Sequence, residues 1–152
     1  MERAGAIQTG DARRVDLDLT PIPAAHVIEG DPVARTTGLT ASDCGTISTC
    51  IWDCTAGRFH WHFGVDEVVH ILDGEVHVTD DDGRTVVLRA GDVGHFPLGS
   101  HSIWHVPEYV RKLAVHRAPK RRPLVLRAAG RLRRLALRGH PVALPALDLL
   151  PI

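Results

Sequence analysis

Two histidines and a glutamate stand close together near the middle of the chain, in the stretch GRFHWHFGVDEVVHILDG from Gly57 to Gly74. His60 and His62 are two residues apart, so in an extended strand both side chains point to the same face. Glu67 follows a short turn that can return its carboxylate to that face. Two imidazoles and one carboxylate, which leave some coordination positions of the metal open, are a typical ligand set for a divalent metal ion. The spacing therefore predicts a metal site formed by these three residues, for Mn, Fe, Zn or Ni.

The elements around this cluster are predicted to be short strands. β-branched and aromatic runs alternate with Gly- and Asp-rich turns, and no helical period appears between residues 46 and 116. Asp73-Gly74 and the Asp80–Gly83 segment read as hairpin turns. The predicted strands cover residues 46–55, 59–63, 67–72, 75–79, 85–88, 95–97, 102–106 and 110–117. This pattern is typical of an antiparallel all-β sandwich or barrel.

The chain length of 152 residues suits one domain with terminal extensions. We expect a loose arm at residues 1–20, a β domain at 21–117 and a basic tail at 118–152. Nine Lys and Arg residues and one acid, Asp148, lie from Arg117 onward, while the preceding part holds nine basic and seventeen acidic residues. Arginines three or four apart predict a basic amphipathic helix at about 124–138 in the tail.

The tail has three candidate partners. Its helix could pack on the acidic body of its own subunit or a neighbour, lie on an anionic membrane surface, or contact nucleic acid nonspecifically. The apolar face of the helix is narrow, which favours docking on protein over membrane insertion. No specific nucleic-acid site is expected.

Two spaced motifs resemble the cupin family. His60-x-His62-x4-Glu67-x6-Gly74 resembles the first cupin motif, and Gly91-x5-Pro97-x-Gly99 resembles the opening of the second. The amino-acid sequence of residues 20–117 resembles those of the cupin subgroup that includes (S)-ureidoglycine aminohydrolase and the ethanolamine-utilisation cupin. This resemblance implies a single jelly-roll β-barrel that holds a metal ion inside.

The second motif departs from the family pattern. Ser102 stands where the family places a fourth ligand, a histidine. His101 and His105 have the opposite strand parity from Ser102 and Trp104, so they should face the other side. A bulge near Gly99 would turn His101 inward and add it to the metal site. Ser102 and Trp104 are expected to line the pocket.

An aromatic stripe alternates with the two histidines. If His60 and His62 face the barrel interior, Phe59, Trp61 and Phe63 must be buried on the other side. An apolar stripe on the outside of a barrel favours a homodimer.

These features support two functions. The first is a metal-dependent enzyme, a hydrolase or lyase in which the metal acts as Lewis acid on a small ureido, amino or carboxylated metabolite. No residue is an unambiguous general base, although His101 or His105 would serve at the mouth of the pocket. The alternative is a non-catalytic ligand- or metal-binding cupin whose basic tail docks a partner.

The cellular compartment is predicted from the cysteines and the N-terminus. The three cysteines contain no Cys-x-x-Cys pair, and the N-terminus lacks an apolar signal region. We therefore expect a cytoplasmic protein.

Overall fold

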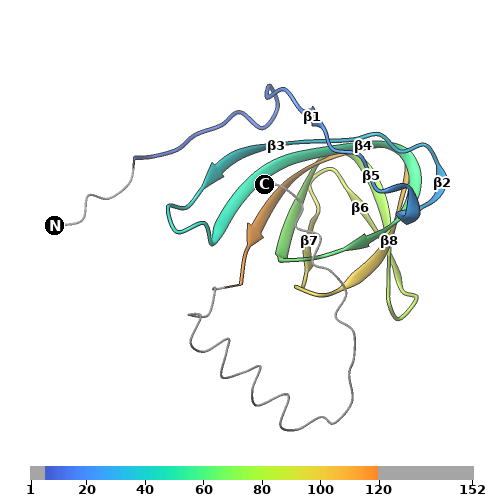
Figure 1. The fold of residues 1–152 in the computed structure, drawn as a ribbon. Coiled ribbons are helices and arrows are strands. Elements are labelled where there is room, and N and C mark those ends of the chain that lie inside the picture. Colours follow the sequence, from blue (N-terminus) through green and yellow to red (C-terminus); the bar gives the residue numbers. More distant parts are fainter. Residues whose placement is uncertain (1–5, 120–152) are drawn as a thin grey trace, which may run out of the picture. The chain divides into compact units, whose positions relative to one another are not determined.

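The structure, a computed structural model, describes residues 6–119, and the predicted tail helix at about 124–138 lies outside the described residues. The described chain is almost entirely β-structure, with a single 3-10 turn, η1 (Ala24–His26). The strands are β1 (Asp18–Leu19), β2 (Val27–Gly30), β3 (Ala34–Ala41), β4 (Ile47–His62), β5 (Asp66–Asp80), β6 (Thr85–Arg89), β7 (Val93–Phe96) and β8 (His101–Arg117). The strands curve around a common interior (Figure 1), which confirms the predicted all-β jelly-roll barrel. No helix within residues 6–119 has the length and apolar character needed to cross a membrane.

The strands pair antiparallel in the order β1-β3-β4-β8-β5-β6, with β2 joined to β4 and β7 joined to β5. The two long strands β4 and β8 pair along their whole length. They pair from Ile47 opposite Arg117 to His62 opposite His101. Residues that are directly opposite in such a ladder share a face of the sheet, so this register decides which side chains of both strands enter the interior.

Three predicted strand breaks are absent, because residues 56–58 lie within β4, residues 73–74 within β5 and residues 107–109 within β8. The ladder register shifts near the first two positions. β4 runs through the expected turn at Gly57, where its register against β8 shifts. β5 runs through Asp73-Gly74, and its register shifts on both sides of Gly74. Gly74 has a φ of 71°, and a left-handed glycine serves a bulge as well as a hairpin turn. The hairpin predicted at residues 80–83 is confirmed, since the Asp80 amide bonds the Arg84 carbonyl across it.

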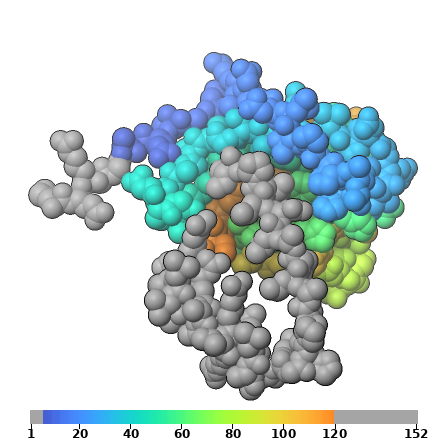
Figure 2. All heavy atoms as spheres, viewed as in Figure 1, coloured from blue at the N-terminus to red at the C-terminus, as the bar shows by residue number. Residues whose placement is uncertain are grey.

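The described part of the N-terminal segment contacts the barrel at several points. β1 pairs with β3. The Gln8 side chain exchanges two hydrogen bonds of 2.9 Å with the backbone of Ala41, and Arg111 donates a bond of 3.0 Å to the Ala12 carbonyl. In Figure 2 this segment, in dark blue, lies along the cyan strands.

Aromatic rings fill much of the interior. Trp52 lies 5.8 Å from both Trp61 and Trp104 and 6.5 Å from Phe59, measured between ring centres. All three arrangements are edge-to-face, which aromatic quadrupoles favour. The rest of the buried apolar cluster comprises Ile22, Ala34, Cys54, Phe63, Val69, Ile71, Val76, Val78, Val106, Val110 and Ala114.

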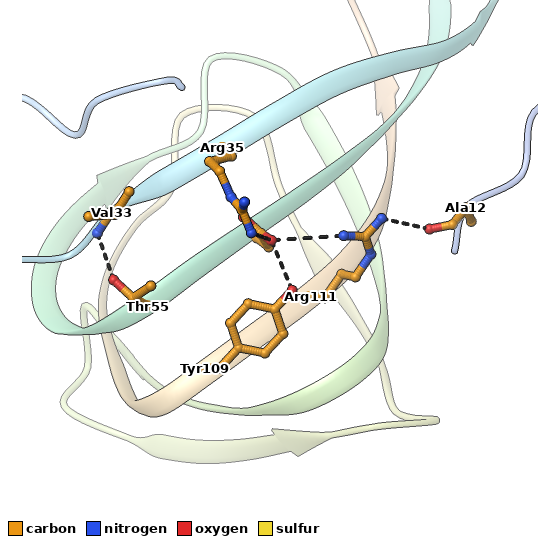
Figure 3. Close-up of polar contacts among 7 residues, drawn as sticks. Ala12, Val33, Arg35, Thr55, Tyr109 and Arg111 are labelled. Carbon is orange, nitrogen blue, oxygen red and sulfur yellow. Dashed lines mark hydrogen bonds and ion pairs between the residues drawn. The ribbon is translucent and has the colours of Figure 1, made fainter. Parts of the chain in front are cut away.

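A buried carboxylate joins three strands outside this cluster (Figure 3). Asp53 on β4 is 1% exposed and accepts bonds of 3.0 and 2.6 Å from Arg35 of β3. It also accepts a bond of 2.8 Å from the Tyr109 hydroxyl, and Arg111 lies 3.8 Å away on the same strand, β8. These partners compensate the cost of burying the Asp53 charge.

Candidate functional site

The structure places His60 and His62 on the outside of the barrel. Both are exposed, whereas Phe59 is fully buried and Trp61 packs against the core. The pairing register explains this orientation. Phe59 lies opposite Trp104 and Trp61 opposite Ser102, so both aromatic residues share the inward face. The expected exterior aromatic stripe is therefore wrong, and the apolar side chains of this strand fill the core.

Glu67 points the other way, into the barrel, and is 6% exposed. The structure thus does not bring Glu67 together with His60 and His62. His101 also lies outside, opposite His62, so no bulge turns it inward. Ser102 and Trp104 are both buried on the interior face, and the Trp104 indole donates a bond of 3.0 Å to the Ser102 hydroxyl.

Glu67 contacts two basic side chains. Lys112 on β8 places its Nζ 2.5 Å from Glu67 Oε1, and His116 Nε2 lies 3.3 Å from Oε2. A metal ion would have to displace an ammonium group that already neutralises this carboxylate. Across residues 6–119, no three His, Cys, Asp or Glu side chains are arranged to hold a metal ion. The interior residues therefore do not fit the metal that the cupin motif implies.

Glu67 is ionised in this environment. Burial alone would raise its pKa, but the Lys112 charge and the contacts with His116 outweigh that effect and lower the pKa from 4.5 to about 2. Glu67 therefore remains an anion that can accept hydrogen bonds at neutral pH.

Lys112 is held between this anion and two aromatic faces. It is 2% exposed, and its Nζ lies 4.5 Å from the centre of the Trp104 ring and 4.9 Å from that of Trp52. Such contacts stabilise a desolvated ammonium group. The buried Nε1 of Trp52 has no hydrogen-bond partner among the described residues.

His116 connects this buried pair to the surface. Its side chain is 29% exposed while it contacts Glu67. It also belongs to the wall of a surface pocket, where Arg117 bonds Asp66 at 3.1 Å. The residues around this pocket are Ile47, Asp66, Val68, His95, Val115, His116 and Arg117.

The exposed histidines form a second cluster on the outer face. The ring centres of His62 and His101 are 4.3 Å apart, and those of His62 and His26 are 5.4 Å apart. His101 Nδ1 lies 3.6 Å from a carboxylate oxygen of Asp81. The pKa of His62 is lowered, first by partial desolvation and then by the neighbouring imidazoles, of which His101 contributes most.

Sequence reasoning missed Lys112 and His116. A signal for them exists in the segment VRKLAVH, where Val110, Ala114 and Lys112 alternate with outward residues. A lysine in the inward position of a buried strand requires a partner, and Glu67 is the carboxylate that supplies it.

Comparisons with known proteins agree with this fold. The EutQ-like cupin domain family matches residues 41–114. The chain is 40% identical over 57 residues to a protein of Salmonella typhimurium named acetate kinase EutQ, covering 38% of this chain but only 24% of that protein. The chain therefore spans about a quarter of the length of this curated relative.

Two solved structures share the fold. An ethanolamine utilization protein Q from Salmonella typhimurium LT2 is 25% identical with a TM-score of 0.51, over 74% of this chain and 98% of that one. A protein of unknown function from Pseudomonas syringae pv. tomato is 22% identical with a TM-score of 0.63, over 68% of this chain and 45% of that one. The predicted resemblance to ethanolamine-utilisation cupins is confirmed: residues 41–114 of this chain match the EutQ-like cupin domain family.

Proposed function

We propose that this chain binds a small carboxylated metabolite at the cluster of Glu67, Lys112 and His116. The observation that carries the proposal is the buried ion pair between Lys112 and Glu67 inside a largely apolar barrel. Replacing such a pair with apolar residues often costs little stability, so a buried pair is weak evidence for a purely structural role. Buried charges beside a cleft are candidates for function.

The hydrogen-bonding groups at this cluster favour a ligand that carries acceptors. The Lys112 ammonium has three donor hydrogens and one carboxylate partner, Glu67. The buried Trp52 indole N–H adds a donor that has no partner among the described residues. A carboxylate or carbonyl oxygen would satisfy these donors, as buried polar groups require.

The pocket beside His116 extends this chemistry. Arg117 offers a cation for a carboxylate, and Asp66, whose pKa is lowered by a bond from the Leu98 amide and by Arg117, offers an anion for an amine. A small amino or ureido carboxylate would use both charges. The curated relative bears the name of an acetate kinase, so acetate is also a relevant carboxylate.

Catalysis is the second candidate, favoured by the contact of His116 with the anionic Glu67. A part-exposed imidazole held by a carboxylate is suited to general acid–base chemistry. If the chain is an enzyme, a hydrolase or lyase reaction would proceed by proton transfer at His116.

Ligand-observed NMR on the full-length protein tests the proposal. The compounds are acetate, small amino and ureido carboxylates, and the uncharged amide of each. We expect the carboxylates to bind more tightly than their amides, and His116→Gln to weaken binding at least about fivefold, because it removes the imidazole that contacts Glu67. His70→Ala, an exposed residue on β5, is the matched control and should bind normally.

Two outcomes would decide against the proposal: equal signals from carboxylates and amides, or unchanged binding in His116→Gln. Following the bound compounds over time then separates the candidates. Product formation that His116→Gln abolishes supports the enzyme, and stable binding without product supports the binding module.

A further inference from the structure

We propose that His62 and His101 form a two-imidazole site for a divalent transition-metal ion on the outer face of the barrel. The two residues are directly opposite each other in the ladder between β4 and β8, and both are exposed. This site lies on the opposite face of the sheet from Glu67 and does not depend on the proposed metabolite.

The spacing of the rings suits one shared ion. A metal–nitrogen bond of about 2 Å places two bound imidazole centres about 4.5 to 5 Å apart, for angles between a right angle and a tetrahedral one. The centres of His62 and His101 are 4.3 Å apart with the ring planes at 87°. A small rotation of either exposed side chain reaches the bound geometry, and such rotations are fast.

Asp81 lies beside His101, one of the two proposed metal ligands. Its carboxylate oxygen lies 3.6 Å from Nδ1 of His101, so Nε2 is the ring nitrogen of His101 that is available to bind a metal. His26, with its ring centre 5.4 Å from that of His62, lies within reach as a third ligand after rotation. As the side chains stand, no three described ligand residues converge, so the site is assigned to the pair.

A second histidine pair nearby is less suited. The rings of His77 and His105 are 5.3 Å apart, but His77 Nε2 is already within 3.0 Å of Glu75. Arg89 lies 3.1 Å from the same carboxylate and adds positive charge. The carboxylate of Asp81, in contrast, has His101 as its one ion-pair partner within residues 6–119, so it is available to favour a bound cation.

Calorimetric titration of the full-length protein, purified without a polyhistidine tag, with Ni²⁺ and Cu²⁺ tests this site. We expect His62→Ala and His101→Ala each to weaken binding at least about tenfold, and Cu²⁺ to bind more tightly than Ni²⁺. His70→Ala and His105→Ala are exposed controls and should change affinity less than about twofold. Thermal unfolding without metal verifies that each variant is folded.

The result that would overturn the proposal is wild-type affinity in either His62→Ala or His101→Ala. An equal or larger loss in His105→Ala would overturn it as well, since the metal would then be bound at the other pair.

Discussion

Lys112 and Glu67 are joined across β8 and β5 by an ion pair of 2.5 Å, and both side chains are almost fully buried. This relationship determines what the barrel interior can do. It places a cation where the cupin motif implies a metal, and it leaves His116 as the polar group that reaches the surface. The polar groups available for chemistry in this interior are therefore the acid and bases Glu67, Lys112 and His116.

Lys112→Met should destabilise the protein by about 3–5 kcal/mol, because the Glu67 carboxylate would remain buried without its partner. The double variant Glu67→Leu/Lys112→Met should recover much of that loss, since it removes both buried charges. Urea unfolding of the three proteins measures these differences. Arg117→Met is the control: it breaks an exposed ion pair with Asp66 between the same two strands and should cost no more than about 1 kcal/mol. Equal costs for Lys112→Met and Arg117→Met would contradict the assigned role of the buried pair.

The Glu67 carboxylate should also make stability depend on acid pH. Its pKa is about 2 in the folded protein, against about 4.5 when exposed, so between these values the unfolded chain binds the proton more readily. The stabilisation, about 3 kcal/mol, is fully present above pH 4.5 and is lost as the pH falls toward 2. Unfolding of the wild type and Glu67→Gln at a series of pH values should show a gap that narrows over this range. A gap that is constant between pH 6 and 2 would show that Glu67 titrates normally.

Asp53→Ala should cost about 3–5 kcal/mol, because it leaves Arg111 and Tyr109 without the buried carboxylate that they share. Tyr109→Phe removes a single neutral donor from the same group and should cost about 1 kcal/mol. Chemical unfolding of both variants tests this order. A Tyr109→Phe cost as large as that of Asp53→Ala would place the stabilisation in the hydroxyl and not in the ion pairs.

The sequence predicted the barrel correctly because turn residues and alternating apolar positions report local structure well. The orientation of the metal motif was predicted wrongly for a non-local reason. Parity within β4 shows that His60 and His62 share a face, but the face is decided by the register with β8, where Phe59 lies opposite Trp104. Since Trp104 was already expected inside, that register alone would have turned the two histidines outward.

The interior polar cluster was missed for a related reason. Glu67 and Lys112 are 45 residues apart, and neither belongs to a spaced motif that links them. Their pairing follows from the register of β5 against β8, in which Glu67 lies opposite His116 and Ile71 lies opposite Lys112. A register between strands that are distant in the sequence is not visible in the local pattern of either strand.

The bulge at Gly74 provides the last test. A methyl group added there would overlap the carbonyl oxygen of Tyr109 on β8, and the residue has a φ of 71°. Gly83 also has a positive φ, 80°, but open space surrounds its missing side chain. Gly83→Ala should therefore cost about 1–2 kcal/mol from backbone strain alone. Gly74→Ala adds a backbone collision and should cost at least about 3 kcal/mol. Urea unfolding of the two variants measures the difference, and equal costs would show that β5 and β8 do not approach closely at this point.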